Sequence, residues 1–212
     1  MKTIQKQLVL LALCTLFAAT SFGQVRIGPA VGFNYSTLMQ DQDKVKVEND
    51  FTIGLRAGLT FDLGIAKFFS IVPEVNFSQM GWKCLGKDQF AGQSETARLN
   101  YIEVPINLVI KLKLGKSTRF DLFAGAYGAY AISGNIKMNY GGGETNKIKV
   151  PFGTNPGQAN RLDIGMNLGI GLEVSRVFVK TQFIVGLNNM SSVEKESMTN
   201  GCFALTLGYF IF

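Results

Sequence analysis

The sequence predicts an all-β protein, an eight-stranded antiparallel up-and-down β-barrel that spans a membrane. Three observations predict this class. Apolar and polar residues alternate with period two in eight segments, as they do in strands whose two faces meet different surroundings. Most of these segments reach the ~9–11 residues that a tilted strand needs to cross a bilayer. The connections alternate between short and long, which is typical of outer-membrane barrels.

The first four expected strands alternate along most of their length. Between Phe51 and Leu63 every odd position is apolar, while the even positions include Arg56 and Asp62. Such a strand presents one apolar face to lipid and one polar face to the interior. The same pattern defines the segments Val25–Ser36, Phe51–Leu63, Phe69–Gln79 and Tyr101–Lys113.

The last four expected strands show the same period. Between Leu162 and Val174 the even positions are all apolar, and the odd positions are glycine or polar residues. The four segments are Arg119–Ser133, Arg161–Val174, Val177–Asn188 and Gly201–Phe212. An even number of strands returns both termini to one side of the membrane, which we expect to be the periplasm.

The N-terminal residues predict export. Lys2 and Lys6 precede the apolar segment Leu8–Ala19, and small residues follow it up to Gly23. This order of charge, short apolar core and small residues is typical of a secretory signal peptide. We therefore expect residues 1–23 to be removed and residues 24–212 to form a barrel domain in the outer membrane of a Gram-negative bacterium.

The expected inner face carries positive and negative side chains in equal number. The interior of an eight-stranded barrel is only wide enough for side chains to fill it. Because an unpaired buried charge is costly, these side chains are expected to pair and close the lumen. A narrow pathway for ions or small solutes is the alternative. Six cations and six anions are counted on this face, with Lys113 among the cations. The expected network consists of Arg26, Arg56, Asp62, Glu74, Glu103, Lys111, Asp121, Arg161, Asp163, Glu173 and Lys180.

The absence of histidine limits the possible chemistry. The chain contains no histidine, which argues against a Ser-His-Asp triad, a Cys-His pair and a His-centred zinc site. We therefore expect a protein that is not an enzyme and that needs no cofactor or metal.

Two cysteines follow the expected signal peptide. Cys84 lies in the second long connection, and Cys202 begins the last expected strand near the same rim. An oxidising compartment would permit a disulfide between them. The alternative of two thiols stays open, because the sequence does not show whether the two residues meet.

Two regions are candidates for partner binding. The long connection Gly134–Asn160 reads as a hairpin that extends the barrel, with Ile136, Met138 and Tyr140 keeping the outward face. Its exposed edge could dock a protein, and a self-packed loop is the alternative. The short turns carry basic residues, which predicts a basic periplasmic rim that meets lipid head groups or an acidic partner. These rim residues are Lys67, Lys116, Arg119 and Arg176. No interleaving of aromatic and basic residues suggests nucleic acid, and nothing indicates an oligomeric state.

Short blocks along the chain are similar to those of one family. They are Phe22–Gln24, Val25–Asn34, Asn100–Asn107, Leu122–Gly125, Asp163–Gly171, Gly186–Asn189 and Leu207–Phe212. Together they resemble the small outer-membrane barrel family of Bacteroidetes, the PorT-like or "outer membrane protein beta-barrel domain" group. That family includes a type IX secretion component and has no shared catalytic residues. The resemblance implies a structural or accessory protein of a secretion or surface assembly, which acts through its extracellular loops or periplasmic rim.

Overall fold

The computed structural model describes residues 25–41, 49–85, 93–140, 144–153, 155, 158–189 and 197–211. The expected signal peptide, residues 1–23, lies outside these ranges. Within the described residues, no helix is long and apolar enough to cross a membrane.

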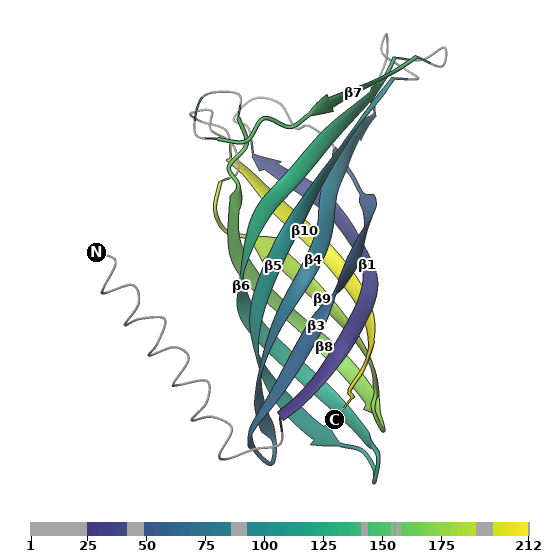
Figure 1. Ribbon diagram of the computed structural model, residues 1–212, viewed down its shortest axis with the longest axis vertical. Helices are drawn as coiled ribbons and strands as arrows, with labels where there is room; N and C mark the ends of the chain where they lie inside the picture. The colour runs from purple at the N-terminus through teal and green to yellow at the C-terminus, as the bar shows by residue number, and fades with distance from the viewer. Residues whose placement is uncertain are drawn as a thin grey trace, which may run out of the picture.

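Eight long antiparallel strands close into one barrel (Figure 1). Each strand pairs with the next along the chain, the last pairs with the first, and the pairing of β4 with β5 completes the ring. The expected up-and-down fold is therefore confirmed. The strands are β1 (Val25–Asp41), β3 (Thr52–Ala66), β4 (Phe69–Leu85), β5 (Ser94–Lys113), β6 (Thr118–Asn139), β8 (Leu162–Val174), β9 (Val177–Gly186) and β10 (Ser197–Tyr209).

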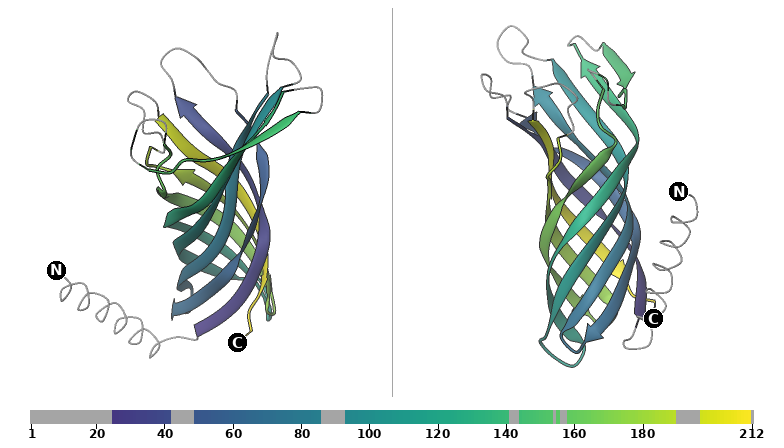
Figure 2. Two further views of the ribbon diagram at one scale, coloured as in Figure 1. Left: turned by 45° about the horizontal axis from the view of Figure 1, so that its top comes forward. Right: turned by 90° about the vertical axis from the view of Figure 1, so that its left-hand side faces the viewer.

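Two short strands flank the ring at one end. β2 (Asn49–Asp50) pairs with β4, and β7 (Thr145–Lys149) pairs with β6. Figures 1 and 2 show β7 at the end where β4, β5 and β6 extend furthest. We call this the long-connection end, and the opposite end, where β3–β4, β5–β6 and β8–β9 are joined, the short-turn end.

The exterior of the barrel is apolar. Along β8 the outward side chains are exposed and the inward ones are mostly buried, so the predicted alternation holds residue by residue. Near the long-connection end, the ring of Tyr35 stacks on that of Phe51 with centroids 4.4 Å apart. So extensive an exposed apolar surface suits lipid rather than water. It includes Val31, Phe33, Ile53, Leu55, Ile106, Leu108, Met166, Leu168, Phe203 and Leu207.

The strands continue further than the sequence predicted at the long-connection end. Residues 80–100 were expected to form a loop, but β4 runs to Leu85 and β5 starts at Ser94. Met80 and Leu99 point inward and are 0% and 1% exposed. The alternation therefore persists, but here apolar side chains face inward, whereas the prediction assumed a polar interior.

A β-bulge interrupts the pairing of β5 with β6. Asn100 pairs with Ser133, but the next residue, Tyr101, pairs with Ala131. Ile132 is therefore an extra residue in β6 without an opposite partner in β5. Beyond this extra residue the two faces of β6 are exchanged. Side chains that would otherwise have faced lipid now point inward, and their neighbours point outward.

The bulge overturns the predicted orientation of the hairpin. The expected hairpin itself is present, since Asn135–Asn139 pairs with β7. However, Ile136 lies opposite Ala97, which is fully buried on the inner face of β5. Lys137 instead lies opposite Thr96, on the outer face. The apolar residues of the hairpin were predicted to face outward, and this was wrong because the sequence does not mark the extra residue.

Candidate functional site

The barrel lumen is the candidate site, and it is closed at several levels. Nearest the short-turn end, Arg26 bridges Asp62 and Glu173, with 2.6 Å from Arg26 Nη1 to Glu173 Oε1. Lys111 Nζ lies 2.7 Å from Asp62 Oδ1. Arg119 Nη2 lies 2.7 Å from Glu173 Oε2 and 3.3 Å from Asp62 Oδ2. Because these residues come from five different strands, the cluster ties much of the ring together.

Two aromatic rings cover this cluster. The guanidinium of Arg26 stacks 4.1 Å from the centroid of the Phe210 ring. That ring contacts the ring of Phe178 with centroids 4.7 Å apart. Phe178 and Phe210 are 6% and 4% exposed, so they shield the ion pairs from one side.

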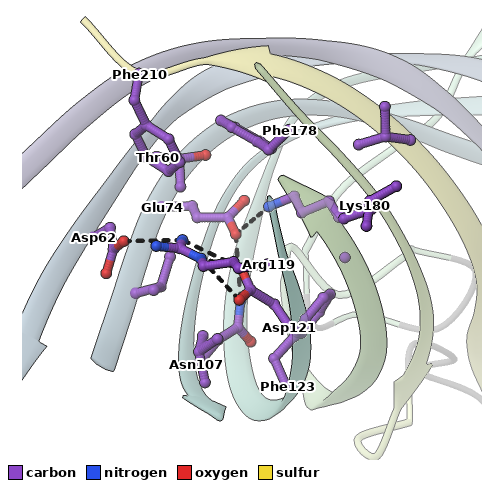
Figure 3. Close-up of a pocket in the computed structure, with 15 residues that line it drawn as sticks. Thr60, Asp62, Glu74, Asn107, Arg119, Asp121, Phe123, Phe178, Lys180 and Phe210 are labelled. Atoms are coloured by element: carbon purple, nitrogen blue, oxygen red, sulfur yellow. Dashed lines mark hydrogen bonds and ion pairs between the residues drawn. The ribbon is translucent and has the colours of Figure 1, made fainter. Parts of the chain in front are cut away.

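The next level contains an ion pair across the full width of the barrel. Glu74 of β4 contacts Lys180 of β9, and these strands lie on opposite sides of the ring. Asn76 and Asn107 donate to the same carboxylate at 3.1 and 3.3 Å. Figure 3 shows this pair beside Arg119, around a cavity of about 40 Å³. A cavity of this size has room for water molecules but not for a larger solute.

The most deeply buried ion pair joins Arg56 and Glu103. The guanidinium donates two hydrogen bonds to the carboxylate, at 2.9 and 2.6 Å. Both side chains are 1% exposed. Two parallel bonds of this kind fix geometry as well as charge. We call the Arg26 cluster, the Glu74–Lys180 pair and the Arg56–Glu103 pair together the ionic layers.

Asp163 is held differently. Its Oδ2 atom accepts hydrogen bonds from Tyr127 Oη at 3.1 Å and from Asn200 Nδ2 at 2.7 Å. The side chain is fully buried, and no described cation pairs with it. Asn200 also donates to Tyr101 Oη at 3.4 Å, which connects β10 to β5 across the ring.

Apolar side chains fill the lumen toward the long-connection end. We call this cluster the apolar layer. Val150 and Phe152, which follow β7, pack onto it together with Trp82 and Met198. The hairpin therefore returns over the barrel and helps to cover its interior. The layer consists of Met80, Leu99, Tyr101, Tyr127, Ala129, Ala131, Ile184, Cys202 and Ala204.

The predicted charged residues are not all in the ionic layers. Arg161 donates to the backbone oxygen of Ala131 at 2.8 Å, and its guanidinium lies 4.7 Å from the centroid of the Phe152 ring. Arg119 was expected at the basic rim, but it turns inward and also binds Asp121, with 2.9 Å from Nε to Oδ1. Arg119 lies two residues before Asp121 on β6 and opposite Glu173 on β8, which explains this turn.

The disulfide that the sequence left open is absent. Cys84 and Cys202 both remain thiols. Cys202 pairs with Ser36, whose hydroxyl contacts the backbone of Gly81. Cys84 lies three residues further along β4, roughly 10 Å at the rise of a strand. Bridged cysteines need Cα atoms within about 7 Å of each other.

Among the described residues, five cations and five anions form ion pairs in the lumen. The same part of the chain contains no group of three or more side chains suited to hold a metal ion. What the geometry provides is closure: paired charges below, a hydrogen-bonded carboxylate between, and apolar side chains above.

Comparison with solved structures finds matches that cover most of this chain. Ail of Yersinia pestis, in complex with the heparin analogue sucrose octasulfate, is 12% identical with a TM-score of 0.43, and the match covers 89% of this chain and 99% of that one. Neisserial surface protein A is 8% identical with a TM-score of 0.45, covering 86% and 96%. The N-terminal barrel of Pseudomonas aeruginosa OprF is 11% identical with a TM-score of 0.33, covering 86% and 97%.

A search of curated proteins found no match. A family model described as "Outer membrane protein beta-barrel domain" matches residues 17–192, which is most of the chain. This match agrees with the closed ring of antiparallel strands and its apolar exterior. The chain belongs to the outer membrane protein beta-barrel domain family.

Proposed function

We propose that this outer-membrane barrel is closed to solutes and acts as a structural or accessory component through its surface. The observation that carries the proposal is the filling of the lumen by the ionic and apolar layers. Glu74 and Lys180 meet across the ring, and Arg56 and Glu103 meet just beyond them. A solute would have to separate both pairs and then cross the apolar layer.

The energies favour closure. Removing one partner of a buried ion pair costs about 3–5 kcal/mol, because the remaining charge stays buried. A hydrated ion would also lose solvation on entering the apolar layer. The cavity beside Glu74 is about 40 Å³, which has room for water molecules but not for a larger solute.

The working surfaces would be the two ends. In this proposal the short-turn end faces the periplasm with both termini, after removal of residues 1–23. The long-connection end faces the outside of the cell. There one edge of β7 pairs with β6, and its other edge is offered to a partner. We further propose a non-enzymatic, PorT-like protein of Bacteroidetes, in a secretion or surface assembly that binds this hairpin or the periplasmic rim.

Conductance in planar bilayers tests the closed lumen. The refolded wild-type protein should give no steady single-channel current, while a porin added to the same bilayers supplies the positive control. A steady current that changes in Glu103→Gln would instead establish the narrow channel, because Glu103 lies inside the lumen. Arg161→Gln is the matched control variant, because Arg161 contacts Ala131 and Phe152 rather than residues of the ionic layers.

Co-purification in mild detergent tests the partner. Deleting residues 139–147 removes most of the hairpin but keeps Val150 and Phe152, which pack on the apolar layer. The wild type should retain a partner that this variant loses. Equal recovery with both proteins would place the interface elsewhere. Replacing Lys67, Lys113 and Lys116, three exposed residues at the short-turn end, by glutamine would then test that end.

A further inference from the structure

The outer face of the extension beyond the bulge carries a concentration of positive charge. Arg98, Lys137 and Lys147 line a groove of about 560 Å³. By strand register, Lys83 lies on the same face opposite Thr96, and Lys149 lies opposite Asn135. We call this surface the basic groove. Its neutral polar lining is Gln79, Thr96, Asn100 and Asn135.

Few negative charges oppose these cations. Asp50 pairs with Lys83 at the border of the groove. Glu95 belongs to the opposite face, because it follows the inward register of Ala97 and Leu99 on β5. The bulge at Ile132 is responsible for this separation, since it turns Lys137 outward and Ile136 inward.

The basic groove continues directly from the apolar exterior. Phe77, Ile102 and Tyr130 face outward on β4, β5 and β6 and are 36%, 40% and 52% exposed. Arg98 precedes Ile102 by four residues on the same face of β5, so it lies roughly 13 Å nearer the long-connection end at the rise of a strand. The cations therefore lie just past the apolar surface, at the height where lipid head groups begin.

A row of hydrogen bonds separates the two zones. Gln79 Nε2 donates to Asn100 Oδ1 at 2.9 Å, and Asn100 Nδ2 donates to Ser133 Oγ at 2.8 Å. The exterior thus changes within a few residues from apolar, through neutral polar, to cationic. This order matches an amphiphile with acyl chains, a polar sugar or glycerol region and phosphate groups.

We propose that the basic groove binds the phosphorylated head group of an outer-leaflet lipid. Its three lining cations supply charge for phosphate oxygens, and its amide and hydroxyl groups supply hydrogen-bond donors. A lipid is the occupant because the groove is continuous with the lipid-facing surface, whereas a soluble polyanion would need no apolar surface below it. The inference goes beyond a closed scaffold and does not depend on whether the lumen conducts.

Native mass spectrometry of the full barrel in neutral detergent tests the proposal. The probe is lipid A with two phosphates, compared with the same lipid after phosphatase treatment. The variant is Arg98→Gln with Lys137→Gln and Lys147→Gln. The matched control is Lys67→Gln with Lys113→Gln and Lys116→Gln, which removes three exposed cations at the short-turn end.

The phosphorylated lipid should bind the wild type and the control within twofold of each other. Binding to the groove variant should be at least tenfold weaker, because each cation near an anionic surface contributes about fivefold. Dephosphorylated lipid should bind the wild type as weakly as the phosphorylated lipid binds the groove variant. Equal binding of the two lipids, or equal binding by the groove variant with an unchanged melting curve, would overturn the proposal.

A soluble polyanion distinguishes the remaining source of negative charge. Dextran sulfate should compete with the lipid only at high concentration. Dextran sulfate could instead bind the wild type tightly, fail to bind the groove variant and leave lipid binding unaffected. In that case the groove serves a soluble polysaccharide and the lipid assignment is wrong. A loss of folded protein is excluded by comparing circular dichroism melting of the groove variant and the control.

Discussion

The two halves of the lumen are closed by opposite means. Toward the short-turn end, the ionic layers fill the barrel with side chains such as Arg26, Glu74 and Lys180 that pair across it. Toward the long-connection end, the apolar layer fills the same ring with side chains such as Met80 and Leu99. An eight-stranded interior is too narrow to remain empty, so either chemistry can close it. The difference predicts different responses to salt and to substitution.

Glu103→Gln should give the largest effect, because it leaves the buried guanidinium of Arg56 without an anionic partner. We expect a loss of about 3–5 kcal/mol in the free energy of unfolding. Urea unfolding of the barrel in lipid vesicles measures it. Replacing both residues, by Arg56→Met with Glu103→Met, should cost less than Glu103→Gln alone. A double variant that is less stable than the single variant would show that the pair is not what holds these residues together.

Leu99→Ala tests the apolar layer by the same measurement. Leu99 is 1% exposed, so its truncation should leave a cavity and cost about 2–4 kcal/mol. The loss should be the same at low and high salt, because no charge is removed. The exposed Leu108 on the same strand is the control, and Leu108→Ala should cost much less in lipid. Equal losses would mean that the layer is not packed.

The sequence predicted the fold better than it predicted the site. Alternation placed Arg56, Glu74 and Glu103 on the inner face, where the structure has them. It did not show which partners meet, because contacts between strands such as β4 and β9 depend on the stagger of the closed ring. Tyr101 and Tyr127 had inward parity in the sequence, and this was the available signal for the apolar layer. The bulge at Ile132 left no such signal, since an extra outward isoleucine looks like ordinary alternation.

Arg26→Gln tests the outermost ionic layer. The side chain of Arg26 is 17% exposed, so water screens its pairs with Asp62 and Glu173 in part. We expect a loss of about 1–2 kcal/mol at low salt. The loss should shrink when the unfolding is repeated in 1 M salt, whereas the effect of Glu103→Gln should change little. A salt response equal for both variants would contradict the ordering of the layers by depth.

Asp163→Asn should give the smallest effect, although Asp163 is as buried as Glu103. Its Oδ2 atom accepts from Tyr127 and Asn200, and an amide oxygen can accept the same two hydrogen bonds. Its Oδ1 atom has no hydrogen-bond partner, so the new amide nitrogen would replace no existing contact. We therefore expect a change within about 1 kcal/mol, measured by urea unfolding beside Glu103→Gln. A loss as large as that of Glu103→Gln would reveal that the charge of Asp163 is itself needed, and the boundary between the ionic and apolar layers would then lie one level higher.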